Sequence, residues 1–450
     1  MKKLRSVLCL LLCLAVLMPL GGTALAADPA PFLLPVRTPD GNTGEVRAYE
    51  ESYPGNVYLS LADLSQAMSG TRGQFRFEYI GTDNCFSVIT GKSPAAPLDR
   101  GAAGARNVVY LDYTRSRLYC NGIERRYSTY REGNRDLYMS LTDVQLLLDM
   151  TASWDESGVL VFDPDMPFAP DLRELEQAGY FEAIGAIVLG DADTGEILYY
   201  KDGRRALPIA SLSKLMTYLL LCEAAERGEI SFSAGVIVTE EADRIARSAD
   251  GMISMSAGTT IPFTELLEGM LLASSNEAAA SLAAYAAGSS DAFVRRMNER
   301  ARELGWTSAR FFTPHGLPLY AGGAIPAKRQ NEMSAMDLFK LCAYLLKNES
   351  RITDITSRQF ANLPTLKYSA YNTNTLVYNV PGVTWLKTGS TDRAGSCVAV
   401  SLPITRDGET HNIVLILLGA ESSALRGQAG EILLRWAQAH YALEAFRPAA

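Results

Sequence analysis

Two groups of strand-like segments stand far apart in the second half of the chain, and they restrict its fold strongly. Residues 183–203 read as two strands around a turn at residues 193–195, which indicates a hairpin. Three more strand patterns lie between residues 383 and 420, beyond a helix-rich stretch over 211–348. An amphipathic helical pattern follows at 427–441. We therefore expect the α/β class, with an antiparallel sheet covered by helices.

An internal repeat marks the first third of the chain as a separate unit. Residues 56–68 (NVYLSLADLSQAM) match residues 136–148 (DLYMSLTDVQLLL), and each reads as an extended stretch that turns into a short amphipathic helix. Asp63 and Asp143 occupy equivalent positions in the first turn, where a negative charge suits the helix dipole. Strand patterns follow both copies, so we expect one smaller α+β module ahead of the sheet domain.

The length of 450 residues also indicates more than one domain. We place the repeat module at 30–165, a Pro-rich linker at 166–172 and the larger domain at 173–445. The module resembles the copper amine oxidase N-terminal-like domain of bacterial surface proteins. Copper is not implied, because the first histidine of the chain is His315.

Residues 1–26 predict a cleaved export signal. Three basic residues precede the apolar run 8–20, and Ala24-Leu25-Ala26 offers small residues for cleavage. An uncleaved anchor is the alternative. Cleavage would remove three basic residues and move the formal charge from −8 to −11. We expect an exported protein, extracellular or associated with the cell wall or membrane, and an acidic one of this kind is a poor candidate for binding nucleic acid.

Five cysteines remain beyond the predicted signal, and their spacing does not indicate a metal site, since it contains no CxxC pair. Cys222, Cys342 and Cys397 stand in apolar patterns typical of buried free thiols. A bridge between Cys85 and Cys120 stays open at this point.

The segment PIASLSKLMTYLLL at 208–221 places two serines beside one lysine at the start of a helical pattern. We expect Pro208 in the first turn. Helical residues three apart share a face, so Ser211 faces Lys214 and Ser213 does not. A crowded lysine can act as a base and activate such a serine. The alternative is a capping serine beside a solvated lysine, and this motif alone does not separate the two.

A Ser-His-Asp triad would need one of the three histidines, His315, His411 or His440. His411 heads a strand pattern and His440 stands near the end of the last helical pattern, so we interpret both as structural. We also interpret His315 as structural, since its motif supplies no adjacent nucleophile or metal ligand. Lys214 is therefore the better base.

Two further motifs complete a set. Ser274-Ser275-Asn276 precedes an Ala-rich helical pattern, and Lys387-Thr388-Gly389 stands on a strand pattern. The order S-x-x-K, S-x-N, K-T-G is the signature of penicillin-recognising serine enzymes. With the blocks SADGMISMSAGTTIPFTELLEGMLLASSNEAA, MNERARELGWTSARFFTPHGL and WLKTGSTDRAG, residues 173–440 resemble the low-molecular-mass D-alanyl-D-alanine carboxypeptidases, peptidase family S11. The resemblance implies a β-lactamase/DD-peptidase-like fold.

The resemblance also implies roles for the motif residues. Ser211 would be the acylated nucleophile, Lys214 its general base, Ser274 a proton relay and Asn276 a ligand of the substrate amide. Lys387 and Thr388 would hold the substrate carboxylate, and Lys387 would lower the pKa of the other lysine. Gly389 would let substrate lie along the strand. Backbone N–H groups of Ser211 and Ser390 would form the oxyanion hole.

Arg426 is a further candidate for the carboxylate site, because it precedes Trp436 by ten positions, as an arginine does in the closing helix of this family. Glu277 departs from the family, which usually has Asp there. The expected activity is removal of the terminal D-alanine from peptidoglycan stem pentapeptides, with β-lactams as inhibitors and no cofactor or metal. A serine β-lactamase and a non-catalytic β-lactam-sensing or wall-binding protein are the alternatives. Any wall association would come through the N-terminal module.

Overall fold

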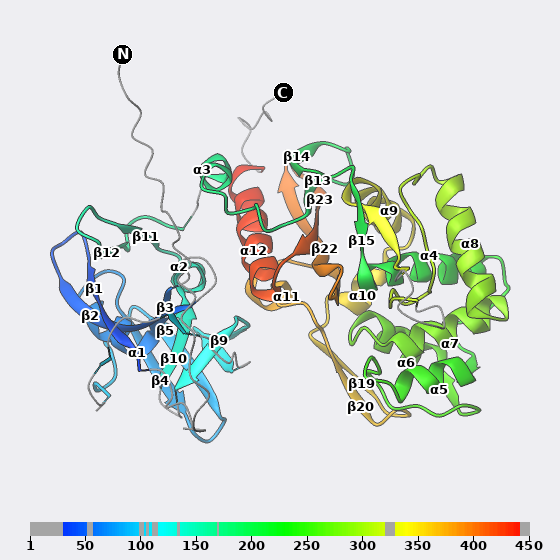
Figure 1. The fold of residues 1–450 in the computed structure, drawn as a ribbon, viewed down its shortest axis with the longest axis horizontal. Helices are drawn as coiled ribbons and strands as arrows, with labels where there is room; N and C mark the ends of the chain where they lie inside the picture. Colours follow the sequence, from blue (N-terminus) through cyan, green and yellow to red (C-terminus); the bar gives the residue numbers. More distant parts are fainter. Residues whose placement is uncertain are drawn as a thin grey trace, which may run out of the picture.

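Figure 1 shows two lobes in the computed structural model, an N-terminal one in blue and cyan and a larger one in green to red. The predicted export signal, 1–26, lies outside the described residues. No helix of the described part combines the length and apolarity needed to cross a bilayer. The structure describes residues 30–51, 57–98, 103–104, 108–109, 116–132, 136–168, 171–319 and 329–441.

The described residues of the N-terminal lobe form two sheets and two short helices. The larger sheet has the order β11-β12-β1-β2-β3-β10-β9, with β6 beside β2, and the smaller has the order β4-β5-β7-β8. The strands are β1 (Phe32–Arg37), β2 (Thr43–Glu51), β3 (Val57–Ser60), β4 (Phe75–Ile80), β5 (Cys85–Thr90), β6 (Val108–Val109), β7 (Arg117–Cys120), β8 (Ile123–Arg125), β9 (Thr129–Glu132), β10 (Asp136–Ser140), β11 (Thr151–Trp154) and β12 (Leu160–Asp163).

The repeat in the sequence is a repeat in the structure. Strand β3 leads into α1 (Leu61–Ala67) and β10 into α2 (Leu141–Leu148), as the pattern predicted. The two strands pair antiparallel, with Tyr138 opposite Ser60 and Ser140 opposite Tyr58, so an approximate two-fold axis relates the copies. Ser60 and Ser140 each cap their helix by accepting a backbone N–H.

The larger lobe is built on a five-stranded antiparallel sheet of order β14-β13-β23-β22-β21. The predicted strands at both ends of this domain therefore share one sheet. Asp407 and Gly408 have positive φ in the turn between β22 and β23, as a tight hairpin connection requires. The strands are β13 (Ala186–Asp191), β14 (Ile197–Lys201), β21 (Trp385–Thr391), β22 (Gly395–Arg406) and β23 (Glu409–Ala420).

Helices and short two-stranded sheets complete this lobe. The helices are α3 (Leu172–Gln177), α4 (Ser213–Glu226), α5 (Glu240–Ala246), α6 (Phe263–Leu271), α7 (Asn276–Ala287), α8 (Ser290–Glu303), α9 (Ala335–Asn348), α10 (Arg351–Thr356), α11 (Leu376–Asn379) and α12 (Ser423–His440). The short strands are β15 (Ala206–Pro208), β16 (Gly235–Ile237), β17 (Thr260–Pro262), β18 (Glu332–Ser334), β19 (Phe360–Leu363) and β20 (Tyr368–Tyr371).

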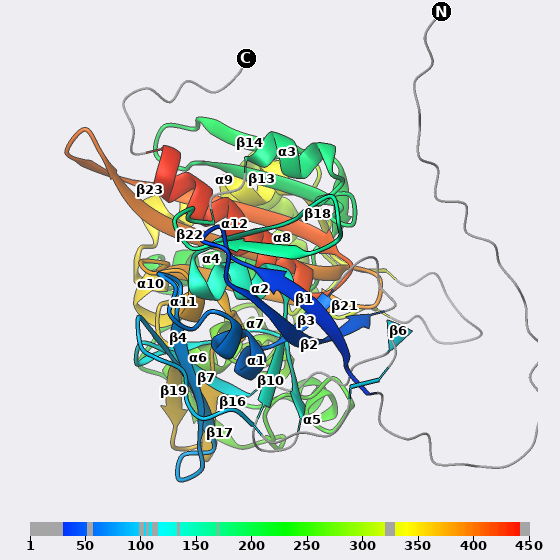
Figure 2. The same cartoon turned by 90° about the vertical axis from the view of Figure 1, so that its left-hand side faces the viewer.

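The two faces of the central sheet belong to different hydrophobic cores. Val414, Ile416 and Leu418 of β23 join the core formed by α4, α7 and α9. The alternate residues Leu415 and Leu417 join a second core, which contains α12 and the buried side chains of the N-terminal lobe. Side chains of a strand alternate between faces, so β23 separates the two cores. Figures 1 and 2 show α12 packed on the sheet on the side of the N-terminal lobe.

Two details differ from the sequence predictions, and one alternative that the sequence left open is resolved. Pro208 ends β15 and pairs with Glu332, so it is not in a first helical turn. Helix α12 begins at Ser423, four residues before the predicted pattern, because Ser422 caps it. Cys85 and Cys120 are buried free thiols: Cys85 lies opposite Arg117 in the β5–β7 pairing and Cys120 opposite Val88, so the two do not meet.

Candidate active site

The segment with Ser211 starts as a 3₁₀ turn, Ala210–Leu212, and continues directly into α4. Ala210 adopts a positive φ of 46°, which is a strained conformation for a residue with a Cβ. Gly316 fits over this turn, since a Cβ on it would lie 2.0 Å from the Ala210 carbonyl oxygen. The Ser213 hydroxyl donates to the same oxygen over 2.6 Å. Ser213 therefore supports the turn Ala210–Leu212, which we call the nucleophile turn after the role predicted for Ser211, whereas the sequence offered Ser213 no role.

Lys214 is fully buried and contacts three oxygen atoms. Its Nζ lies 2.9 Å from Ser211 Oγ, as helical spacing predicted, and 2.8 Å from both Asn276 Oδ1 and the His315 carbonyl oxygen. Two of these partners only accept hydrogen bonds, whereas a serine hydroxyl can donate. A neutral amine has two N–H groups and one lone pair. If Lys214 donates its two N–H hydrogen bonds to Asn276 Oδ1 and the His315 carbonyl, its lone pair therefore points at the Ser211 hydroxyl.

The electrostatic surroundings favour this neutral form. Burial holds the pKa of Lys214 well below its ordinary value, and the positive charge of Lys387 lowers it further. The carboxylate of Glu277 acts in the opposite direction and raises it. The predicted effect of Lys387 is thus present, but burial is the larger cause.

The S-x-N motif lies at the start of α7. Ser275 caps the helix by accepting from the Ala278 N–H. Asn276 accepts from Lys214 and donates to the Asp250 carbonyl oxygen over 2.9 Å. Ser274 has a positive φ of 62°, and within the described part of the chain no hydrogen bond joins its hydroxyl to Ser211 or Lys214.

Glu277 has a structural task next to this motif. Its side chain is completely buried, and its Oε1 accepts the backbone N–H groups of Met252 and Ile253. The loop that it holds also supplies the Asp250 carbonyl to Asn276. Glu277 therefore fixes the loop that orients Asn276, and sequence reasoning noted it only as a departure from the family.

The K-T-G motif lies on β21, an edge strand that pairs with β22 alone among the described strands. Lys387 is 1% exposed, and its pKa is lowered to about 7. Burial is the larger cause and the positive charge of Arg426 is the smaller one. The Lys387 Nζ donates to the Thr388 carbonyl oxygen. The Thr388 hydroxyl lies 2.5 Å from that of Thr373, a residue that the sequence analysis did not identify.

The fold gives a second reason for Gly389, besides the predicted space for substrate. A Cβ at this position would lie 2.9 Å from the Ser211 backbone nitrogen and 3.0 Å from the Ile209 carbonyl oxygen. The chain's own nucleophile turn therefore occupies the space that the missing side chain leaves. Next along β21, Ser390 is exposed, and its hydroxyl lies 3.4 Å from Ser396 Oγ.

The predicted site residues thus come together from several elements. Ser211 lies in the 3₁₀ turn that leads into α4 and Lys214 in α4 itself, Asn276 lies in α7, Lys387 and its neighbours in β21, and Arg426 in α12. The His315 carbonyl is a ligand of Lys214 that sequence reasoning missed, although the block TPHGL was recognised as part of the pattern. Burial and Lys214 lower the pKa of the His315 imidazole to about 3, in agreement with a structural ring.

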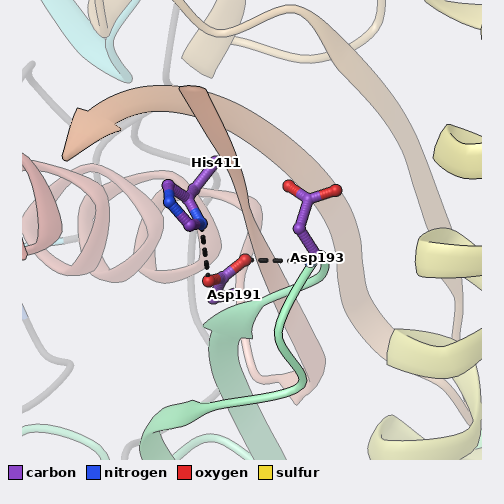
Figure 3. A group of neighbouring side chains, drawn as sticks. All are labelled: Asp191, Asp193 and His411. Atoms are coloured by element: carbon purple, nitrogen blue, oxygen red, sulfur yellow. Dashed lines mark hydrogen bonds and ion pairs between the residues drawn. The ribbon is translucent and has the colours of Figure 1, made fainter. Parts of the chain in front are cut away.

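A second cluster of titratable groups lies at the far end of β13. Figure 3 shows Asp191, Asp193 and His411 close together, a grouping that could ligate a metal. Asp191 already accepts hydrogen bonds from Thr194 and, over 2.7 Å, from the Tyr441 hydroxyl. It also shares a hydrogen bond with His411 Nδ1 over 3.0 Å. Asp193 accepts the Asn412 backbone N–H. We therefore interpret the cluster as a network that joins the β13–β14 turn to the end of α12.

Comparison with known proteins agrees with this geometry. The chain is 32% identical to the D-alanyl-D-alanine carboxypeptidase DacF of Bacillus subtilis over 54% of its length, which is 59% of that protein. It is 30% identical to a D-alanyl-D-alanine endopeptidase of Pseudomonas aeruginosa over 50% of its length and 68% of that protein. The chain thus spans about three fifths of the Bacillus relative.

A solved structure shares the fold. The peptidoglycan synthesis regulatory factor (PBP3) of Streptococcus pneumoniae superposes with a TM-score of 0.52 at 28% identity, over 56% of this chain and 73% of that one. The family model of the D-alanyl-D-alanine carboxypeptidases, Peptidase_S11, matches residues 176–422, which is more than half of the chain. This match lies wholly outside the repeat module, whose own resemblance stays a prediction. The chain belongs to the D-alanyl-D-alanine carboxypeptidase family, peptidase family S11.

Proposed function

We propose that the protein is a serine-type D-Ala-D-Ala carboxypeptidase that removes the terminal D-alanine of peptidoglycan stem pentapeptides through an acyl-enzyme on Ser211. The observation that carries this proposal is the set of three contacts at Lys214. Two carbonyl acceptors and one hydroxyl surround a lysine whose burial favours the neutral form. This arrangement supplies a base beside a serine, which is the requirement for an activated nucleophile.

In the acylation step, the Ser211 hydroxyl gives its proton to Lys214 while its oxygen bonds to the carbonyl carbon between the two D-alanines. The oxyanion forms next to the backbone N–H groups of Ser211 and Ser390. The C–N bond then breaks, and the proton on Lys214 passes, with Ser274 as relay, to the amine of the departing D-alanine. Asn276 would bind the substrate amide once substrate approaches. No metal or cofactor takes part in this scheme.

Deacylation repeats the same proton transfers with water. Lys214 accepts a proton as the water oxygen attacks the ester carbon, and Ser211 recovers that proton when the ester bond breaks. A β-lactam would acylate Ser211 in the same way, and slow hydrolysis would make it an inhibitor. Both steps use one base, whose position is fixed by the Asn276 and His315 contacts.

The terminal carboxylate would bind next to Lys387 and Thr388, with Arg426 beside them. A bound carboxylate raises the pKa of a nearby ammonium group, so substrate would restore the positive charge of Lys387. Cationic and hydroxyl donors at this position would select peptides with a free C-terminal carboxylate. We further propose that the protein is exported and that the N-terminal module, 30–165, contributes to its association with the cell wall.

The decisive experiment is intact-mass analysis after penicillin treatment, with peptide mapping of the adduct. We expect one adduct on Ser211, none on Ser211→Ala, and release of D-alanine from a pentapeptide mimic. Labelling without D-alanine release would instead favour a non-catalytic β-lactam sensor, and rapid nitrocefin turnover would favour a β-lactamase. Equal labelling of Ser211→Ala would refute the mechanism. Deletion of the module that leaves wall association unchanged would refute the module's part in it.

A further inference from the structure

A cavity of about 260 Å³ lies between the N-terminal lobe and α12, close to the proposed carboxylate site. Arg117, Glu124 and Arg126 line it from the N-terminal lobe. Thr373 and Arg426 line it from the larger lobe. The cavity is therefore a composite pocket, since both lobes supply charged or polar walls.

This composite pocket begins where the proposed carboxylate site ends. Thr373 belongs to both, because its hydroxyl lies 2.5 Å from the Thr388 hydroxyl of the K-T-G motif. Arg426 also belongs to both, since it lines the pocket and its charge lowers the pKa of Lys387. A group that continues past the carboxylate held at Lys387 would thus enter the pocket.

The walls of the pocket carry more positive than negative charge. Three arginines face two acidic residues, Glu124 and Asp143. Glu124 is paired with Arg126 over 3.1 Å, and burial raises the pKa of Asp143 to about 7, which leaves it partly neutral at that pH. The remaining positive charge stands out in a chain with a formal charge of −8. Such walls favour an anionic ligand.

The wall from the N-terminal lobe is fixed before any ligand binds. The Arg126 N–H donates to Asn379 Oδ1 over 2.8 Å, and Asn379 Nδ2 donates back to the Arg126 carbonyl over 3.0 Å. The Arg126 guanidinium stacks over the Tyr378 ring at 3.6 Å from its centroid. Arg125 also donates to the Tyr378 carbonyl. A preformed wall of this kind is typical of ligand pockets.

We propose that the N-terminal module completes a specificity subsite on the leaving-group side of Ser211, which binds a carboxylate carried by the leaving residue beyond its own terminal carboxylate. The proposal rests on the proposed function, because that function defines which side the leaving group occupies. The ligand class is a stem peptide whose last residue is acidic, for example D-Ala-D-Glu in place of D-Ala-D-Ala. Arg117 would supply the charge that recognises it, and the Arg126–Glu124 pair would form the neighbouring wall.

The test compares two peptides of equal size whose leaving residue is D-Glu or D-Gln. We expect wild-type protein to hydrolyse the D-Glu peptide with a kcat/KM about two- to fivefold higher, a factor typical of a charge contact at an exposed arginine. Arg117→Glu should remove or invert this ratio. Arg117 is exposed, and its hydrogen-bond partners, Tyr119 Oη and the Asp83 carbonyl, lie in its own lobe. Arg117→Gln, a milder change, should lower the ratio less.

Arg72→Glu is the matched control, because it makes the same change in net charge at an exposed position outside the pocket lining. It should leave the ratio unchanged. Equal hydrolysis of the two peptides by wild-type protein, or an unchanged ratio in Arg117→Glu, would overturn the subsite. Failure of wild-type protein to release D-alanine from D-Ala-D-Ala would instead contradict the proposed function. In that case binding of the two peptides to Ser211→Ala still decides the subsite, since only the subsite predicts tighter binding of D-Glu.

Discussion

At Lys214, two neighbouring charges act on one amine with opposite signs. Lys387 lowers the pKa of Lys214 and Glu277 raises it, on top of the larger effect of burial. As the proposed base, Lys214 must be neutral to accept the Ser211 proton, so its pKa would set the acid limb of the acylation rate. This balance makes the direction of two pH shifts predictable.

Replacing Lys387 should move the acid limb to higher pH. Without its positive charge the pKa of Lys214 rises, and a larger fraction of the base is protonated at any given pH. The measurement is the pH dependence of the second-order rate of penicillin acylation for Lys387→Met and wild-type protein. The substitution also weakens binding of the penicillin carboxylate, which changes the height of the rate curve. The prediction is therefore tested by the pH at which the acid limb lies.

Glu277→Gln should shift the same limb to lower pH, because it removes the charge that raises the pKa of Lys214. The amide keeps an oxygen that can accept the Met252 and Ile253 N–H groups, so the loop should stay in place. Thermal unfolding of the variant checks that point. Shifts of the same sign in Lys387→Met and Glu277→Gln would contradict the assignment of Lys214 as base.

Ser213→Ala tests a hydrogen bond behind the nucleophile. The Ser213 hydroxyl donates to the Ala210 carbonyl in a buried turn with strained φ, so its loss should cost about 1 kcal/mol of stability. We expect a lower Tm and slower but measurable penicillin acylation, whereas Ser211→Ala should abolish acylation. An unchanged Tm would show that the turn does not depend on this bond.

At the scale of elements, tight backbone contacts hold the nucleophile turn in place. Gly316 has a φ of 93°, and a Cβ there would overlap the Ala210 carbonyl. We expect Gly316→Ala to abolish penicillin acylation, because either the turn moves or the domain fails to fold. Gly408→Ala is the control, since Gly408 also has a positive φ of 83° but a Cβ there meets nothing within 4 Å. It should cost only about 1–2 kcal/mol and keep acylation.

The elements also show what the sequence could and could not predict. The strands of the central sheet and its hairpin turns follow from local patterns, as do the two repeat copies with their capping serines. The start of α4 was misjudged because Pro208 pairs with β18, more than a hundred residues further along the chain. The Ser211–Lys214 contact is local and was predictable, whereas the His315 carbonyl and Thr373 reach the site only through tertiary packing.

At the scale of the whole molecule, contacts join the two lobes around the predicted linker at 166–172. Asp171 caps α3, and Phe168 packs against the core that the N-terminal lobe shares with α12. Polar contacts cross the same boundary, including Arg435 to the Leu146 carbonyl over 2.9 Å and Gln428 to Ser140 over 2.9 Å. A shared core with hydrogen-bonded edges should unfold cooperatively.

We therefore expect calorimetry to show one unfolding transition for both lobes, and Asn379→Ala to weaken their coupling. Asn379 is buried, and it makes two hydrogen bonds to the Arg126 backbone and one to the Glu431 carboxylate. Its loss leaves these polar groups unpaired, at a cost of about 2–4 kcal/mol of stability. The variant should show a lower or split transition and a smaller D-Glu to D-Gln ratio, because the Arg126 wall loses its anchor. Asn348→Ala, at an exposed helix end, is the matched control and should change neither measurement. Two transitions in wild-type protein would mean that the lobes fold independently, and the module could then not serve as a fixed wall of the pocket.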